Sequence, residues 1–161
     1  MRTTDKYVFF YGGPFSQWFR CKFTVDGIKF NCTEQFMMAG KARLFKDDEM
    51  QAKIMESTDP HEQKMKYGRN VRNFVVDVWN AHCKEIVYEA NCAKFSQNEE
   101  LKKVLLGTGS RIIVEASPYD RIWGIGLGEN DDLVLDQKKW RGTNWLGEVL
   151  MRVRDEHFKG V

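Results

Sequence analysis

The hydrophobic pattern of this chain changes character once, close to residue 33, and that change limits the folds open to it. Before this point, residues 7–11 and 21–25 are rich in β-prone side chains, and Asp26-Gly27 marks a hairpin turn from 21–25 into residues 28–30. Beyond it, apolar residues recur mainly three or four positions apart, as they do on helices. Parallel βαβ units would alternate strands and helices throughout, so this order argues against a Rossmann fold.

The helical part of the sequence divides at its capping and breaking residues. Thr33 is the expected N-cap of the first helix, with Glu34 in the first turn, where the helix dipole favours an anion. Pro60 fits the first position of a third helix, which should end at Gly68. A long central segment is expected to be buried on more than one side. The expected helices cover residues 33–44, 47–55, 60–67, 73–95, 98–106 and 143–158, with a short buried strand at 112–114 and an irregular glycine-rich stretch at 117–145.

These elements predict an α+β fold, in which one helix-dominated domain over residues 1–161 carries a small antiparallel sheet. A chain of 161 residues buries roughly 70% of its unfolded surface, which is enough for one hydrophobic core. Its 25 basic and 23 acidic residues leave a net charge of +2. Proteins dedicated to duplex nucleic acid are normally far more basic, so this class is disfavoured. A small basic pocket for a phosphorylated ligand remains compatible with this charge.

The four cysteines, Cys21, Cys32, Cys83 and Cys92, form no C-x-x-C pair and have no histidine at zinc-ligand spacing. The N-terminal residues lack the apolar stretch of a signal peptide, and no apolar run approaches the length of a membrane span. We therefore expect an intracellular, cytoplasmic protein with reduced cysteines in its core. We expect no metal, no cofactor and no membrane contact.

Glu34 and Lys41 are the first candidate functional pair. Seven residues turn a helix through about 700°, so both side chains point nearly the same way, roughly 10 Å apart along the axis. They are either two solvated charges on an outer face or a pair facing a cavity. The helix around them is apolar nearly all round, which leaves little polar surface for solvated charges.

A second group of candidates lies in and before the glycine-rich stretch. Trp123 offers a flat stacking face and Asp120 an acceptor for ribose hydroxyls, although packing alone also explains such a loop. Arg69, just past a helix end, has a guanidinium fork suited to phosphate, or it is a surface residue. The run Gly124-Ile125-Gly126-Leu127-Gly128 does not fit the G-x-G-x-x-G fingerprint, so its glycines more simply allow close backbone approach to a ligand or to the core.

Taken together, these separate pieces resemble the NADAR family of YbiA-like N-glycosidases, in order and over almost the whole chain. The matching residues are Phe10, residues 13–19, Val25-Asp26-Gly27, residues 33–41, Gly68-Arg69, Trp79, Lys94-Phe95, Asn98, Leu101, Leu105-Leu106, Ser117-Pro118, Asp120, Trp123-Gly124, Gly126, Gly142, Asn144 and Leu146-Gly147. Two positions depart from the family pattern: Ile125 is polar in some members, and Trp145 stands where a basic residue often follows the Asn.

The resemblance implies a YbiA-like fold and cleavage of a bond between ribose C1 and a nitrogen. It assigns catalytic roles to Glu34, Lys41 and Asp120. In this scheme Glu34 relays a proton, Lys41 attacks C1 as a Schiff-base nucleophile, and Asp120 holds ribose hydroxyls. Substrate binding is assigned to Arg69, which would face a phosphate, Trp123, which would pack on the sugar or base, and Gly124, Gly126 and Asn144.

Three functions remain open on the sequence. The first is hydrolysis of ribosylamino-pyrimidine phosphates, which are small intermediates of riboflavin synthesis. The second is removal of ADP-ribose from guanine in nucleic acid, which should need a basic rim. Lys138, Lys139 and Arg141, with Trp140 among them, form either such a rim or a solvated loop. The third is a non-catalytic module that binds ADP-ribose or NAD, against which the retained Glu34 and Lys41 argue. The oligomeric state is not predictable.

Overall fold

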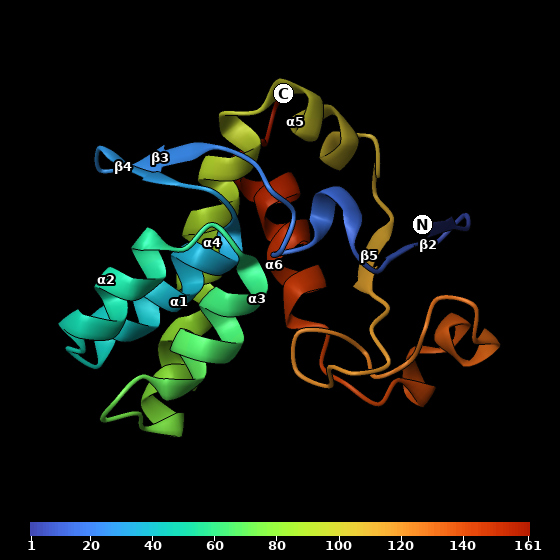
Figure 1. Ribbon diagram of the computed structural model, residues 1–161. Helices are drawn as coiled ribbons and strands as arrows, with labels where there is room; N and C mark the ends of the chain where they lie inside the picture. Colours follow the sequence, from blue (N-terminus) through green and yellow to red (C-terminus); the bar gives the residue numbers. More distant parts are fainter. The chain divides into compact units, whose positions relative to one another are not determined.

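Strand β2 (Tyr7–Phe10) organises the first of two units in the computed structural model, which describes all residues 1–161 (Figure 1). This first unit comprises Met1–Ser16 and Glu100–Val161, and the second comprises Gln17–Glu99. β1 (Arg2–Thr3) pairs antiparallel with β2, and β2 pairs in parallel with β5 (Ile112–Glu115), with Phe9 opposite Val114. This three-stranded sheet is therefore mixed, whereas the expected antiparallel hairpin lies in the second unit.

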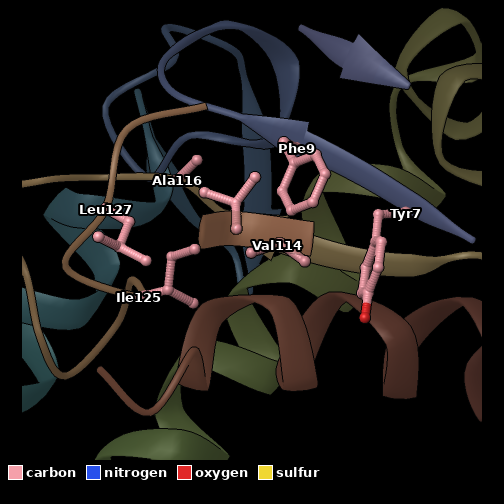
Figure 2. Packing of buried hydrophobic residues seen from close by; sticks show 7 residues of the cluster. Tyr7, Phe9, Val114, Ala116, Ile125 and Leu127 are labelled. Atoms are coloured by element: carbon pink, nitrogen blue, oxygen red, sulfur yellow. The ribbon is translucent and has the colours of Figure 1, made fainter. Parts of the chain in front are cut away.

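The core of the first unit lies on this sheet and on the glycine-rich stretch that follows β5. The Phe9 ring is fully buried beside Val114, and Ile125 and Leu127 complete the cluster from the loop (Figure 2). The first unit also contains α5 (Glu99–Leu106) and α6 (Trp145–Arg152), which packs on β5. Its four short helical segments are η1 (Gly13–Phe15), η4 (Asp132–Leu135), η5 (Gln137–Lys139) and η6 (Val153–His157).

The second unit is mainly helical. β3 (Phe23–Val25) and β4 (Ile28–Phe30) form the predicted antiparallel hairpin around Asp26-Gly27, where both turn residues have positive φ. Helix α1 (Thr33–Leu44) packs against both α2 (Asp48–Glu56) and α4 (Val76–Ser96). Between α2 and α4 the chain forms α3 (Pro60–Glu62), η2 (Gln63–Tyr67) and η3 (Gly68–Asn70). The predicted α+β class with dominant helix is confirmed; the single domain over residues 1–161 stays a prediction.

Three sequence predictions are wrong in detail. The N-cap of α1 is Cys32, whose Sγ accepts a hydrogen bond from the Gln35 backbone, and Thr33 is the first helical residue. The last helix begins at Trp145, because Asn144 adopts a left-handed conformation that cannot belong to it. The long central helix begins at Val76, and its first turn is not buried on more than one side. The apolar residues just before and within this turn, Phe74, Val75, Val76 and Val78, are each 39–55% exposed.

Residues further along α4 are core as predicted, with Trp79 9% exposed and Phe95 completely buried. All four cysteines are free thiols, two of them fully buried. None of the helices combines the length and the hydrophobicity that a membrane span requires.

Truncating Phe95 tests this core. Phe95→Ala removes a buried ring and leaves a cavity, so the free energy of unfolding should fall by about 3–5 kcal/mol. Urea denaturation followed by circular dichroism measures the loss. Tyr119→Ala is the matched control, because this aromatic side chain is 84% exposed. Equal, small losses in both variants would contradict the burial of Phe95.

Candidate active site

Helix α1 carries the predicted pair, Glu34 and Lys41, and its first turn is fixed by buried polar side chains. The Glu34 backbone N–H donates to the Gln17 carbonyl at 2.9 Å. The Gln17 side-chain oxygen accepts from Thr33 Oγ1 at 2.8 Å and from Asn91 Nδ2, on α4, at 3.1 Å. Gln17 thereby ties the start of α1 to α4. The Glu34 side chain, only 3% exposed, is consequently held in a position set by the surrounding fold.

The Lys41 side chain is half-buried about two turns further along the same face of this helix. Its Nζ donates a hydrogen bond to the Gly68 carbonyl at 2.8 Å. Two aromatic rings face the same ammonium, with centroids 4.6 Å away for Phe74 and 5.9 Å for Trp79. The ammonium is thus held by one acceptor and two apolar rings rather than by a paired carboxylate.

The charges around Lys41 act in opposite directions. Burial lowers the pKa of the Lys41 ammonium below its ordinary value, and the nearby positive charges of Arg69 and Lys64 lower it further. The negative charge of Glu34 raises it but does not reverse the shift. A lysine with a lowered pKa is unprotonated more often at neutral pH, and the unprotonated amine is the nucleophile. The site therefore supplies a carboxyl group and an activated amine from one helix.

The lack of a side chain at Gly68 allows the Gly68 carbonyl to reach Lys41. A Cβ at this position would overlap the Met38 thioether on α1. Without a side chain, η3 packs closely on α1 and presents its carbonyl to Nζ. The neighbouring Arg69 side chain is exposed and adds a second positive charge beside the amine.

A second lysine, Lys94 on α4, is completely buried. Burial lowers the pKa of Lys94 to about 8, opposed by the thiols of Cys21 and Cys32. The rings of Phe95 and Phe19 lie 5.1 and 5.5 Å from its Nζ. Because Lys94 has no exposed surface, Lys41 is the one of these two lysines with access to a ligand.

Asp120 and Trp123 lie in the first unit, in the loop after β5. Asp120 Oδ1 accepts hydrogen bonds from the backbone N–H groups of Ile122 and Trp123, at 2.9 and 2.8 Å. Its Oδ2 takes part in neither bond. The half-buried Trp123 ring packs edge-on against Trp145, 5.6 Å between centroids. The Asp120 carboxylate thus shapes the turn that presents Trp123.

Two glycines of this loop, Gly124 and Gly142, allow close packing of backbone on backbone. A Cβ on Gly124 would lie 2.9 Å from the Glu115 carbonyl, and one on Gly142 would overlap the Gly124 carbonyl. Gly126 has a φ of +71°, which other residues rarely adopt. The sequence allowed close backbone approach either to a ligand or to the core, and at Gly124 the structure supports approach to the protein's own backbone.

Asn144 connects the loop to the sheet. Its Oδ1 accepts from the Glu115 N–H and its Nδ2 donates to the Ile113 carbonyl, both at 3.0 Å. The side-chain amide is buried, and both its oxygen and its nitrogen are hydrogen-bonded to β5. Asn144 therefore positions the start of α6, and any contact with a substrate would come in addition to this structural role.

The basic segment near the end of the loop is less suited to nucleic acid than its composition suggested. Lys138, Lys139 and Arg141 are exposed. Trp140, however, packs on the core cluster, and its Nε1 donates to the Val134 carbonyl at 2.8 Å. Part of the indole surface is consequently used for core packing, which leaves less of it for stacking between the basic residues.

A shallow, open cavity of about 310 Å³ also lies in the first unit. None of the predicted site residues lines it; its walls come from Tyr11, Ala116, Pro118, Tyr119, Gly128, Glu129, Asn130 and Asp131.

The predicted residues fall into two groups. Glu34, Lys41 and Arg69 gather in the second unit, and Asp120, Trp123, Gly124, Gly126 and Asn144 in the first. Their meeting in one pocket stays a prediction. Sequence reasoning missed Lys64 and Phe74 beside Lys41. Phe74 could have been found as an aromatic residue just before a helix start, but its apolar neighbours made it look like core.

Comparison with known proteins places these residues in a family. A family model described as the NADAR domain matches residues 9–157. The N-glycosidase R617 of Acanthamoeba polyphaga mimivirus is 48% identical over 168 residues, covering 96% of this chain and 98% of its own. The chloroplastic riboflavin biosynthesis protein PYRR of Arabidopsis thaliana is 38% identical over 73 residues, covering 45% of this chain and 10% of its own.

The fold has a solved counterpart. The NMR structure of the E. coli protein YbiA matches with a TM-score of 0.77 at 26% identity, covering 97% of this chain and 87% of that one. The expected YbiA-like fold is thereby confirmed.

Proposed function

The chain belongs to the NADAR family, and on that premise we propose that it is an N-glycosidase that hydrolyses the C1–nitrogen bond of ribosylamino-pyrimidine phosphates through an imine on Lys41. The observation that carries this proposal is the half-buried Lys41 amine, with its lowered pKa, on the same helix as the buried Glu34 carboxyl group. Similarity to proteins named N-glycosidases supports the reaction class.

The first half of the reaction replaces the nitrogen on C1. The ribosylamine opens its ring as the bond between C1 and the ring oxygen breaks, which leaves an alkoxide on that oxygen and C1 doubly bonded to the protonated nitrogen. The neutral Lys41 amine adds to C1, forming a C–N bond while the π electron pair of the double bond returns to the pyrimidine nitrogen. The Glu34 carboxylate then takes a proton from the lysine nitrogen and passes it to the pyrimidine amine, which leaves with the electron pair of its bond to C1. The sugar is now held on Lys41 as a protonated imine.

The second half releases the sugar. Water adds to C1 of the imine and gives a proton to the Glu34 carboxylate. Glu34 passes this proton to the Lys41 nitrogen, the bond between C1 and Lys41 breaks, and the lysine leaves as a neutral amine with the electron pair of that bond. The hydroxyl proton on C1 passes to the ring-oxygen alkoxide, which leaves the sugar as its aldehyde. The products are ribose 5-phosphate and the free aminopyrimidine. Glu34 ends in its starting protonation state, and no cofactor is consumed.

We assign binding of the phosphorylated sugar to two basic side chains beside Lys41 and to residues of the first unit. Arg69 and Lys64 supply positive charge beside Lys41, and a guanidinium fork matches phosphate oxygens. Asp120 would accept from ribose hydroxyls through Oδ2, and Trp123 would pack on the sugar or base. Gly124, Gly126 and Asn144 would shape this wall chiefly through the backbone.

Two observations favour the small substrate over ADP-ribosylated guanine in nucleic acid. The similarity to a riboflavin biosynthesis protein, although partial, points to ribosylamino-pyrimidine chemistry. The packing of Trp140 on the core cluster weakens the case for a basic rim that binds nucleic acid, because part of the indole is used by the core. Removal of ADP-ribose therefore remains the second candidate, and a non-catalytic ADP-ribose- or NAD-binding module the third.

One assay separates the three. Purified protein is incubated with a ribosylamino-pyrimidine phosphate and, separately, with DNA carrying ADP-ribosylated guanine, and products are identified by mass spectrometry. We expect ribose 5-phosphate from the first. Release of ADP-ribose alone would select the second candidate, and binding without release from either substrate would select the third.

A further inference from the structure

We propose that Phe74 is a positioning residue for Lys41, and that its ring, fixed by the Arg72–Asp47 ion pair, keeps water away from the amine. The proposal rests on the proposed function for its role in catalysis. The placement of the ring stands on geometry, independently of the substrate.

Phe74 is the aromatic residue closest to the amine. Its ring centroid is 4.6 Å from Lys41 Nζ, nearer than that of Trp79, and 5.3 Å from the ring of Phe45. The side chain is nevertheless 42% exposed, so it lies between the amine and solvent rather than in the core. The ring therefore covers part of the Lys41 amine on its solvent side.

The segment before Phe74 is held by one buried carboxylate. Asp47, 1% exposed, accepts from the Arg72 backbone N–H at 2.8 Å, from Nε at 3.2 Å and from Nη2 at 2.7 Å. The Arg72 guanidinium holds the pKa of the Asp47 carboxyl well below its usual range. Asn73, the one residue between Arg72 and Phe74, has a φ of +63°, which sets the turn. The start of α2, capped by the same Asp47, thus determines where the Phe74 ring lies.

The ring has two opposite effects on the amine. Excluding water disfavours the ammonium, whereas the π face attracts it. The charged groups that also face Lys41 are Glu34 on α1, Lys64 on η2 and Arg69 on η3, and none of them changes when Phe74 is replaced. Burial is the largest influence on this amine, so removing the ring should raise the pKa of Lys41.

Competitive labelling with acetic anhydride across a pH series tests the proposal without any substrate. The reagent modifies only unprotonated amines, and peptide mapping reports Lys41, with Lys46 in the same digest as the reference. Phe74→Ala should move the Lys41 midpoint upward by about one pH unit, so that roughly tenfold less amine is unprotonated at neutral pH. Phe74→Leu keeps apolar cover without a π face, so its midpoint should equal the parent's or lie below it.

Further variants separate the effect of the Phe74 ring from that of the Arg72–Asp47 ion pair that fixes it. Arg72→Lys keeps a positive charge beside Asp47 but loses the fork, and its midpoint should rise part of the way. Val78→Ala, an exposed apolar change on the first turn of α4, should leave the midpoint unchanged. Parent-like midpoints in folded Phe74→Ala and Arg72→Lys proteins would overturn the proposal, as would a rise in Phe74→Leu. If Phe74→Ala does not fold, Arg72→Lys and Phe74→Leu decide.

Activity assays distinguish this inference from the proposed function. If both hold, kcat of Phe74→Ala falls at neutral pH and recovers at higher pH. If the parent protein cleaves neither substrate while the labelling midpoints move as expected, the proposed function fails and the role of Phe74 stands.

Discussion

Borohydride added during turnover should leave a covalently attached sugar on Lys41. The reagent reduces an imine to a stable amine, so the adduct mass reports the sugar and peptide mapping reports the lysine. Lys41→Arg should abolish both turnover and trapping, because a guanidinium with a pKa above about 12 stays protonated and is a poor nucleophile. The loss should be close to complete, since no other amine lies beside Glu34 on α1.

The neighbouring lysines provide the controls for this experiment. Lys46→Arg and Lys53→Arg should trap as much sugar as the parent. A sugar found on Lys94 would contradict the inaccessibility of that buried side chain. An active Lys41→Arg protein without an adduct would show that no imine forms and would indicate direct attack of water on an oxocarbenium-like C1. Lys41 would then have an electrostatic or binding role.

Glu34→Gln should lower kcat by about 10²- to 10⁴-fold, the usual contribution of a general acid–base group. An amide of the same shape keeps hydrogen bonds but transfers no proton. The pH dependence of the same variant provides a second, independent check. The Glu34 charge raises the pKa of Lys41, so removing it lowers this pKa and leaves more neutral amine. The acid limb of the pH–rate profile should therefore move to lower pH while kcat falls.

Glu89→Gln, an exposed carboxylate on α4, is the control for this change and should keep full activity. Circular dichroism should show both variants folded. Glu34→Gln with an unaltered kcat would mean that water or the substrate itself supplies the proton.

Local signals in the sequence predicted much of the fold. The Asp26-Gly27 turn is a strong hairpin signal, and β3 and β4 form there. The cap of α1 was misplaced because capping preferences favour Thr33 over a cysteine. The parallel pairing of β2 with β5 joins residues about a hundred positions apart, and neither segment alone indicates its partner.

The candidate site was predictable only where it lies on one element. Glu34 and Lys41 share a helix face, so their spacing was enough to pair them. The Asp47–Arg72 contact spans 25 residues and depends on how α2 meets the chain before α4. Phe74 was assigned to the core because hydrophobic pattern reports side-chain type and not exposure. Trp140 was read as a surface residue because its charged neighbours hid its packing.

Because Glu34 and Lys41 are seven residues apart on one continuous helix, their separation is a property of the backbone hydrogen bonds of α1. Substitutions in the surrounding loops can alter which sugar or base is held without disturbing the distance between acid and amine. Such an arrangement lets substrate preference diverge during evolution while the reaction is inherited unchanged. For protein engineering, it follows that substrate preference should be changed through the surrounding loops, while α1 is left unaltered.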